Sequence, residues 1–144
     1  MELESYIIFK KGNLDFTFKT LTELDVTKEY VSGLKSQKKY IEYIPKNISL
    51  DIQKKYINKI SRSKNNYIFG IFSNNTLVGT SGIQLCNSSD FYEGLSDKID
   101  KIATVGILIF NKNFRGMGLG KTLVWAATFL SFKSKISNHF GTGM

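Results

Sequence analysis

The most constraining feature of this sequence is the segment from Thr104 to Thr122. An apolar, β-branched run there leads through a short polar turn into a basic, glycine-rich loop. The run up to Phe110 predicts a strand, and the periodic apolar residues after the loop predict an amphipathic helix. A strand, a loop of little bulk and a helix N-terminus together form an anion site, because free N–H groups and the helix dipole favour negative charge. Arg115 and Lys121 add positive charge. The segment therefore predicts a phosphate-bearing ligand, and we expect a pyrophosphate.

Three phosphate-binding patterns compete for this loop. The last three residues of the P-loop pattern match Gly120-Lys121-Thr122. The pattern also requires a glycine at position 115, where this sequence has Arg115. The dinucleotide fingerprint G-x-G-x-x-G does not fit the G-x-G-x-G spacing of residues 116–120, which also lie late in the chain. The third pattern, Arg/Gln-x-x-Gly-x-Gly/Ala, fits residues 115–120 at every defined position.

This third pattern resembles the acetyl-CoA loop of the GNAT superfamily of N-acetyltransferases. From Phe16 onward, the expected order of elements is also similar to that family: a strand, one or two helices, a hairpin, a long strand, the loop and a helix. The segment that runs from Tyr30-Val31-Ser32-Gly33-Leu34 through Tyr56-Ile57 resembles one branch of the superfamily. That branch includes the ribosomal-protein, spermidine and nucleotide-amino-sugar acetyltransferases. The resemblance implies an α/β protein of mixed α+β type. Its central, mostly antiparallel sheet would be flanked by helices in one GNAT-like domain over residues 1–144.

The resemblance also implies how acetyl-CoA, the acyl donor, is held. The loop amides would bind its pyrophosphate, and backbone groups near Leu108 to Phe110 would pair with its pantetheine arm like an added strand. A backbone amide there would polarise the thioester carbonyl. Arg115 would contact phosphate. The predicted cofactor-binding residues are Leu108, Ile109, Phe110, Arg115, Gly116, Met117, Gly118, Leu119, Gly120 and Lys121.

The implied activity is transfer of an acetyl group to a primary amine on a small molecule or peptide. The acceptor classes are a nucleotide-linked amino sugar, a polyamine or a protein N-terminus. Asp90 and Glu93 lie in an acidic loop where the family often places substrate contacts, and Tyr43 is a candidate for lining the acceptor pocket. The alternative is that these residues form a solvated loop and ordinary packing. No catalytic base is assigned, and the family's tyrosine acid would fall beyond Met144.

The C-terminal segment from His139 resembles the start of the family's next strand, and the family's remaining strands and helix do not follow within the 144 residues. We therefore expect a C-terminally truncated form. A catalytically inactive CoA-binding remnant is the alternative function, and a small nucleotide-binding protein with a degenerate P-loop is the third. The sheet edge that truncation leaves exposed would favour a homodimer.

Composition excludes several other classes of protein. One cysteine, Cys86, and one histidine, His139, offer no recognisable metal site and no intrachain disulfide, so we expect a cytoplasmic protein without a metal. No window approaches the roughly 20 apolar residues that span a bilayer, so we expect no membrane partner. The net charge of +8 is scattered along the chain, which does not favour a nucleic-acid partner.

Local patterns predict the other elements. A helix should begin at Thr27 and stop at Gly33, and a second, capped by Ser49, should cover residues 50–61. A hairpin should join residues 67–72 to residues 76–85 through an Asn-rich turn. The strand at residues 102–110 should be buried on both faces, because it is apolar on both.

Overall fold

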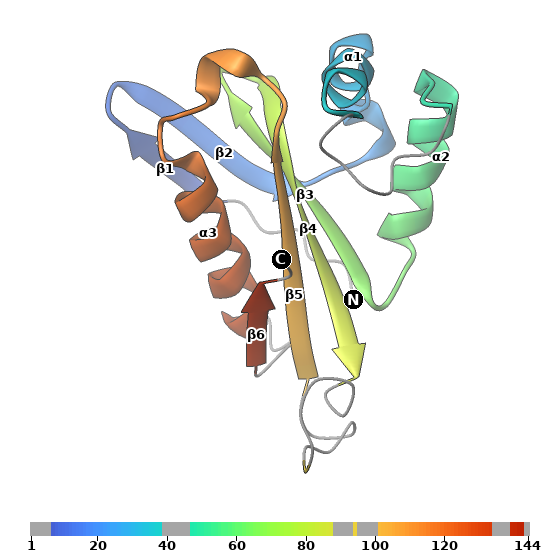
Figure 1. Cartoon of the computed structure of the whole chain (residues 1–144), viewed down its shortest axis with the longest axis vertical. Helices are drawn as coiled ribbons and strands as arrows, with labels where there is room; N and C mark the ends of the chain where they lie inside the picture. Colours follow the sequence, from blue (N-terminus) through green and yellow to red (C-terminus); the bar gives the residue numbers. More distant parts are fainter. Residues whose placement is uncertain (1–6, 39–46, 88–93, 95–100, 134–138, 143–144) are drawn as a thin grey trace.

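A computed structural model describes residues 7–38, 47–87, 94, 101–133 and 139–142 of the chain. These residues form one sheet in the strand order β1-β2-β3-β4-β5-β6 (Figure 1). The first five strands pair antiparallel with their neighbours in sequence, and β6 pairs parallel to β5. The mixed α+β fold with a mostly antiparallel sheet is thereby confirmed. The strands are β1 (Ile7–Lys11), β2 (Leu14–Thr20), β3 (Asn66–Ser73), β4 (Thr76–Asn87), β5 (Lys101–Ile109) and β6 (His139–Thr142).

Helices cover both faces of this sheet. The helices α1 (Lys28–Ser36) and α2 (Leu50–Ser61) lie over one face, and α3 (Leu119–Lys133) lies over the other (Figure 1). Each face buries its own apolar cluster, since side chains alternate between the two faces of every strand. The cluster under α3 includes Phe16, Phe18, Phe69, Ile71, Val105, Leu123, Ala126 and Leu130. The cluster under α1 and α2 includes Val26, Tyr30, Val31, Ile57, Phe72 and Phe110.

The helix caps and the hairpin turn follow their local sequence signals. The Thr27 hydroxyl accepts a hydrogen bond from the Tyr30 N–H at 3.2 Å, and Ser49 caps α2 in the same way at 3.2 Å. The β3–β4 turn places Asn74 and Asn75 at φ +49° and +65°, a left-handed conformation that asparagine tolerates. These predictions are confirmed. Each could be made from the sequence because it depends only on residues that are close together in the chain.

The predicted stop of the first helix at Gly33 is wrong. The helix α1 continues through Gly33 to Ser36. A Cβ at Gly33 would collide with the ring of Phe110, which follows β5. Tyr30 contacts the same ring edge-on, with the centroids 5.7 Å apart. Gly33 is therefore required for close packing of α1 against the end of β5, not for ending the helix.

Burial of the central strand is also less complete than its apolar sequence predicts. Ile102, Ala103 and Val105 are buried, whereas residues 107–109 are only partly buried and Gly106 is exposed. The strand β6 pairs with residues 102–105 only. The second half of β5 thus has one paired edge, formed by β4, and one edge that no strand covers among the described residues.

Candidate functional site

The loop after β5 is anchored to the core before it reaches its glycines. Asn111 caps a short 3₁₀ helix, Lys112–Phe114, by accepting a hydrogen bond from the Asn113 N–H at 3.1 Å. The Phe114 ring then packs edge-on against Phe16, with the centroids 6.0 Å apart. Met117 packs partly buried against the cluster under α3. The loop is therefore held on both sides of Arg115 and Gly116, which is the rigidity that a preorganised anion site needs.

Two glycines give the loop a backbone shape that other residues rarely adopt. Gly116 and Gly118 both have φ +73°, in the left-handed region. A Cβ at Gly116 would meet no atom within 4 Å, so the space beside this residue is open. The Gly118 carbonyl accepts a hydrogen bond from the Thr122 N–H at 3.5 Å, which starts α3. The glycine pattern seen in the sequence thus leads directly into a helix N-terminus.

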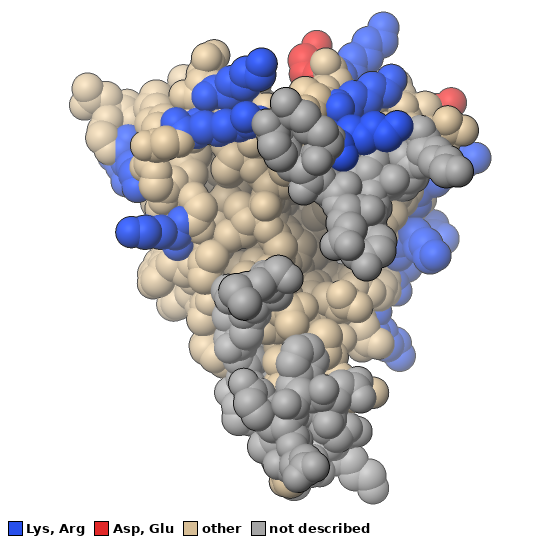
Figure 2. All heavy atoms as spheres, viewed as in Figure 1, with Lys and Arg blue, Asp and Glu red and all other residues tan. Residues whose placement is uncertain are grey.

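The first turn of α3 carries positive potential. The N–H groups at the start of a helix have no partner within the helix, and its dipole adds partial positive charge there. The first turn, which includes Gly120 and Lys121, contains no acidic residue. Figure 2 shows lysine and arginine side chains gathered along the upper edge of the molecule, over the loop that follows β5. Leu119 is buried beneath this turn and fixes it to the core. The predicted pyrophosphate ligand suits this potential.

Arg115 is exposed and turns back toward the strand. Its Nε–H donates a hydrogen bond to the carbonyl oxygen of Ile109 at 3.1 Å. This contact ties the first residue of the glycine motif to the end of β5. The terminal guanidinium nitrogens keep their own N–H groups, so the arginine can hold the strand end and still meet an anion.

The predicted pantetheine contacts lie where the sheet edge is open. Leu108 and Ile109 end β5 on the part of the strand that β6 does not pair, and Phe110 is buried against α1. An edge with unpaired backbone groups is the surface to which an extended ligand adds as a further strand. The strand end and the glycine loop are therefore continuous parts of one surface.

A pocket of about 380 Å³ lies over the same sheet, beside α2. Its floor contains two glycines that face each other in register, Gly82 on β4 and Gly106 on β5. The next pair on the same face of the sheet is Gln84 and Thr104, two positions along each strand. Added Cβ atoms at either glycine would meet nothing closer than 4.0 Å, so both glycines leave the floor open. The lining residues are Tyr56, Ile60, Asn66, Tyr67, Ile68, Gly82, Ile83, Gln84, Thr104, Val105 and Gly106.

The pocket lining mixes aliphatic side chains with neutral polar ones and contains no charged side chain. Burial raises the pKa of Tyr67, whose hydroxyl donates to the Lys64 carbonyl at 3.3 Å and stays protonated near neutral pH. The Thr104 hydroxyl donates to the Gln84 carbonyl at 3.4 Å. Our sequence reasoning missed this pocket. A glycine within an apolar strand is a signal of close approach by a ligand or another backbone, and Gly82 and Gly106 carried that signal.

Several predicted features are not addressed by the structure. Asp90, Glu93 and Tyr43, the predicted acceptor contacts, lie outside the described residues. Within the described ranges, no group of three or more His, Cys, Asp or Glu side chains could hold a metal ion. No helix in the same part of the chain is long and apolar enough to cross a membrane.

Comparison with known proteins agrees with this geometry. The family model described as "Acetyltransferase (GNAT) family" matches residues 33–140. Among solved structures, glucosamine-6-phosphate N-acetyltransferase from Arabidopsis thaliana has a TM-score of 0.65 at 16% identity, over 90% of this chain and 82% of that chain. An aminoglycoside N-acetyltransferase in complex with CoA has a TM-score of 0.62 at 13% identity, over 94% and 81%. A predicted acetyltransferase with acetyl-CoA from Clostridium acetobutylicum has a TM-score of 0.63 at 14% identity, over 90% and 80%. No curated protein matches this chain in sequence.

Proposed function

Because this chain belongs to the GNAT acetyltransferase family, we propose that it transfers the acetyl group of acetyl-CoA to a primary amine on a small molecule, with an amino sugar as the leading class of acceptor. The observation that carries the proposal is the continuity of the open β5 edge with a two-glycine loop at the N-terminus of α3. This surface offers strand-like pairing at one end and anion binding at the other. A ligand with an amide-containing arm and a pyrophosphate requires both kinds of interaction: backbone hydrogen bonds for the amides and an anion site for the pyrophosphate.

The residues present fit acetyl-CoA in three respects. The open space beside Gly116 admits a phosphate close to the backbone. The first turn of α3 supplies N–H donors around Gly120 and Lys121. The edge of β5 near Leu108 and Ile109 would supply backbone groups for the pantetheine amides, apart from the Ile109 carbonyl, which accepts a hydrogen bond from Arg115. When bound, acetyl-CoA supplies an activated acyl thioester, and this chain supplies the surface that orients it.

The acceptor amine would enter the pocket beside α2. The pocket's volume of about 380 Å³ lies within the range of small-molecule sites. Its floor includes Gly106, two residues before the predicted pantetheine contacts on β5. Neutral polar groups on Gln84 and Thr104 can orient hydroxyl groups of a sugar. The amino-sugar class is further supported by the glucosamine-6-phosphate and aminoglycoside acetyltransferases among the similar structures.

The transfer itself requires a neutral amine. Its nitrogen would attack the thioester carbonyl carbon and form the amide bond. The carbon–sulfur bond would break, and CoA would leave as a thiolate that takes up one proton while the amine nitrogen loses one. A pocket lining without charged side chains favours the neutral amine, because burial disfavours the ammonium form. Asp90 and Glu93, predicted from the sequence as acceptor contacts, carry carboxylates that could receive this proton, and neither is assigned as the catalytic base.

Titration calorimetry of the purified chain tests the proposal. We expect acetyl-CoA to bind with micromolar affinity and ATP-Mg not to bind, and we expect thiol release from acetyl-CoA in the presence of an amino sugar. Binding of ATP-Mg alone would favour the degenerate P-loop alternative and contradict the assignment. Binding of acetyl-CoA without turnover toward amino sugars, polyamines or peptides would instead support the inactive remnant.

A pocket-filling variant tests where the acceptor binds. In Gly82→Leu, the new side chain would rise from β4 into the pocket, where nothing lies closer than 4.0 Å to its Cβ. The fold should tolerate it, since a branched or aliphatic residue suits an extended strand better than glycine does. We expect kcat/KM for the amine to fall by about tenfold or more, as a steric clash of about 1.4 kcal/mol implies. The affinity of the same variant for acetyl-CoA serves as the control and should be unchanged. An unchanged kcat/KM would place the acceptor elsewhere.

A further inference from the structure

A lysine from the opposite end of the chain lies at the glycine loop. Lys11 ends β1, immediately before the turn into β2. Its Nζ lies 2.6 Å from the position that a Cβ at Gly118 would occupy. The absence of a side chain at Gly118 is therefore what gives the ammonium group room to lie against the loop. Sequence reasoning grouped this residue with scattered surface lysines and gave it no role.

The direction of Lys11 is set by the sheet. Side chains alternate between the two faces of a strand, so Lys11 shares its face with Phe9, and Lys10 points to the other face. Phe9 stacks on Phe16 with the ring centroids 5.3 Å apart, and Phe16 in turn contacts Phe114 of the loop. The same aromatic packing thus holds the hairpin and the loop in fixed relation. The position of Lys11 relative to the loop is therefore fixed by core packing.

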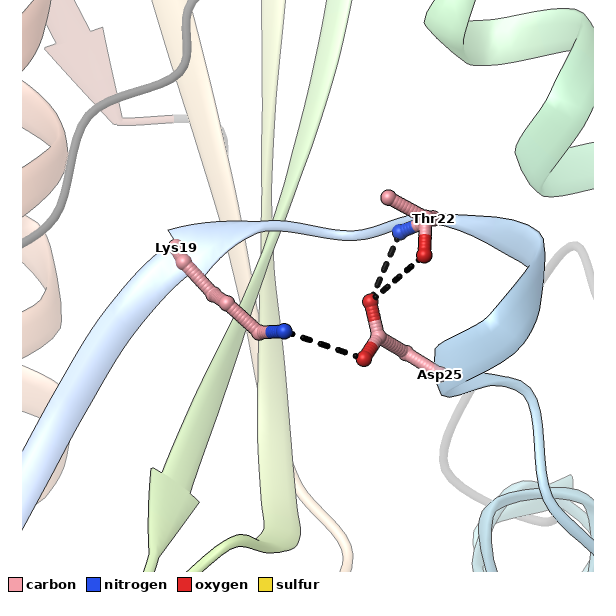
Figure 3. A network of polar contacts seen from close by, with 3 residues as sticks. All are labelled: Lys19, Thr22 and Asp25. Carbon is pink, nitrogen blue, oxygen red and sulfur yellow. Dashed lines mark hydrogen bonds and ion pairs between the residues drawn. The ribbon is translucent and has the colours of Figure 1, made fainter.

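Lys11 also differs from its neighbours in its charge partners. Lys10 is 78% exposed in its side chain and pairs with Asp15 at 3.6 Å. Lys19 pairs with Asp25 at 3.2 Å, and that carboxylate is also held by the backbone N–H and hydroxyl of Thr22 (Figure 3). Lys11 is half-buried, and no described carboxylate forms an ion pair with it. A half-buried ammonium group without a counter-charge favours an anionic ligand.

We propose that Lys11 is a phosphate-binding residue, whose ammonium group donates to the pyrophosphate of acetyl-CoA across Gly118; this inference rests on the proposed function. The pyrophosphate would then lie between the backbone N–H groups of the first turn of α3 and a side chain from the β1–β2 hairpin. Binding would link the β1–β2 hairpin to the glycine loop, because both would contact the same anion.

Two neighbouring substitutions test the inference as a matched pair. Lys11→Met and Lys10→Met remove the same charge from adjacent residues of one strand. Calorimetric titration with CoA and with dephospho-CoA, which lacks the 3′-phosphate, should show both affinities about tenfold or more weaker in Lys11→Met. Lys10→Met should change them less than twofold. Lys11→Arg, which retains the positive charge, should keep most of the affinity, and thermal melts of all three variants should match the unmodified protein.

The possible failures are distinguishable. If the unmodified protein binds no CoA, the proposed function fails. If it binds CoA and Lys11→Met binds equally well, Lys11 is not a ligand and the inference is overturned. If only CoA binding weakens and dephospho-CoA binding does not, Lys11 contacts the 3′-phosphate and the pyrophosphate assignment is overturned. Equal losses in Lys10→Met and Lys11→Met would indicate a general charge effect and would also overturn the inference.

Discussion

Gly118→Asp is expected to abolish acetyl-CoA binding while leaving the protein folded. The residue has φ +73°, where an L side chain is strained by about 1 kcal/mol. A new Cβ would approach Lys11 Nζ at 2.6 Å. The carboxylate would then lie against the predicted pyrophosphate and would pair with the lysine in its place. We expect at least a hundredfold loss of affinity, or about 2.7 kcal/mol, in a calorimetric titration.

A second glycine gives the control for this experiment. Gly94 also has a positive φ, at +85°, and a Cβ there would meet no atom within 4 Å. It lies in the connection before β5, at the other end of that strand from the loop. Gly94→Asp therefore introduces the same charge and similar backbone strain away from the glycine loop where acetyl-CoA is proposed to bind. Its affinity for acetyl-CoA should match that of the unmodified protein. An undiminished affinity in Gly118→Asp would contradict the pyrophosphate site.

Phe16→Ala is expected to cause the largest loss of stability. Phe16 is fully buried on β2 and contacts the rings of Phe9 and Phe114. Removing a buried phenyl ring costs about 3–5 kcal/mol, because the lost transfer energy adds to the cost of the cavity. That is a large part of the roughly 5–15 kcal/mol that stabilises an ordinary domain. The free energy of unfolding, measured by urea titration, should fall accordingly.

The neighbouring strand offers a matched comparison. Ile8 on β1 is 76% exposed, so Ile8→Ala should change the free energy of unfolding by no more than about 0.5 kcal/mol. Phe16→Ala should also weaken acetyl-CoA binding at temperatures where it stays folded, because Phe114 would lose the ring that anchors the loop. A stability loss no larger than that of Ile8→Ala would mean that the aromatic cluster does not support the fold as described.

The elements that the sequence predicted well are those specified by neighbouring residues. The cap at Ser49, the helix over Leu50–Ser61 and the left-handed turn at Asn74 each depend on a few adjacent side chains. The glycine loop belongs to this group as well, since the spacing from Arg115 to Gly120 is itself the signal. The family match over residues 33–140 agrees with the assignment that this spacing suggested.

The errors arose where a residue's role depends on a distant contact. Gly33 looks like a helix stop because glycine has low helix propensity, yet the helix continues because the Phe110 ring packs against that glycine. The apolar strand at residues 102–110 looks buried throughout, yet Gly106 is exposed on the floor of a pocket and residues 107–109 lie along an open edge. Neither outcome can be read from a window of neighbouring residues.

By itself the sequence determined the local backbone: where helices begin, which turn needs a left-handed residue, and that a strand leads through a glycine-rich loop into a helix. Only the tertiary structure decided that Gly82 faces Gly106 across a pocket floor and that Lys11 lies at Gly118. The physical reason is that caps, turns and periodicity act over a few residues. Strand register and core packing, by contrast, bring together side chains that are far apart in the chain.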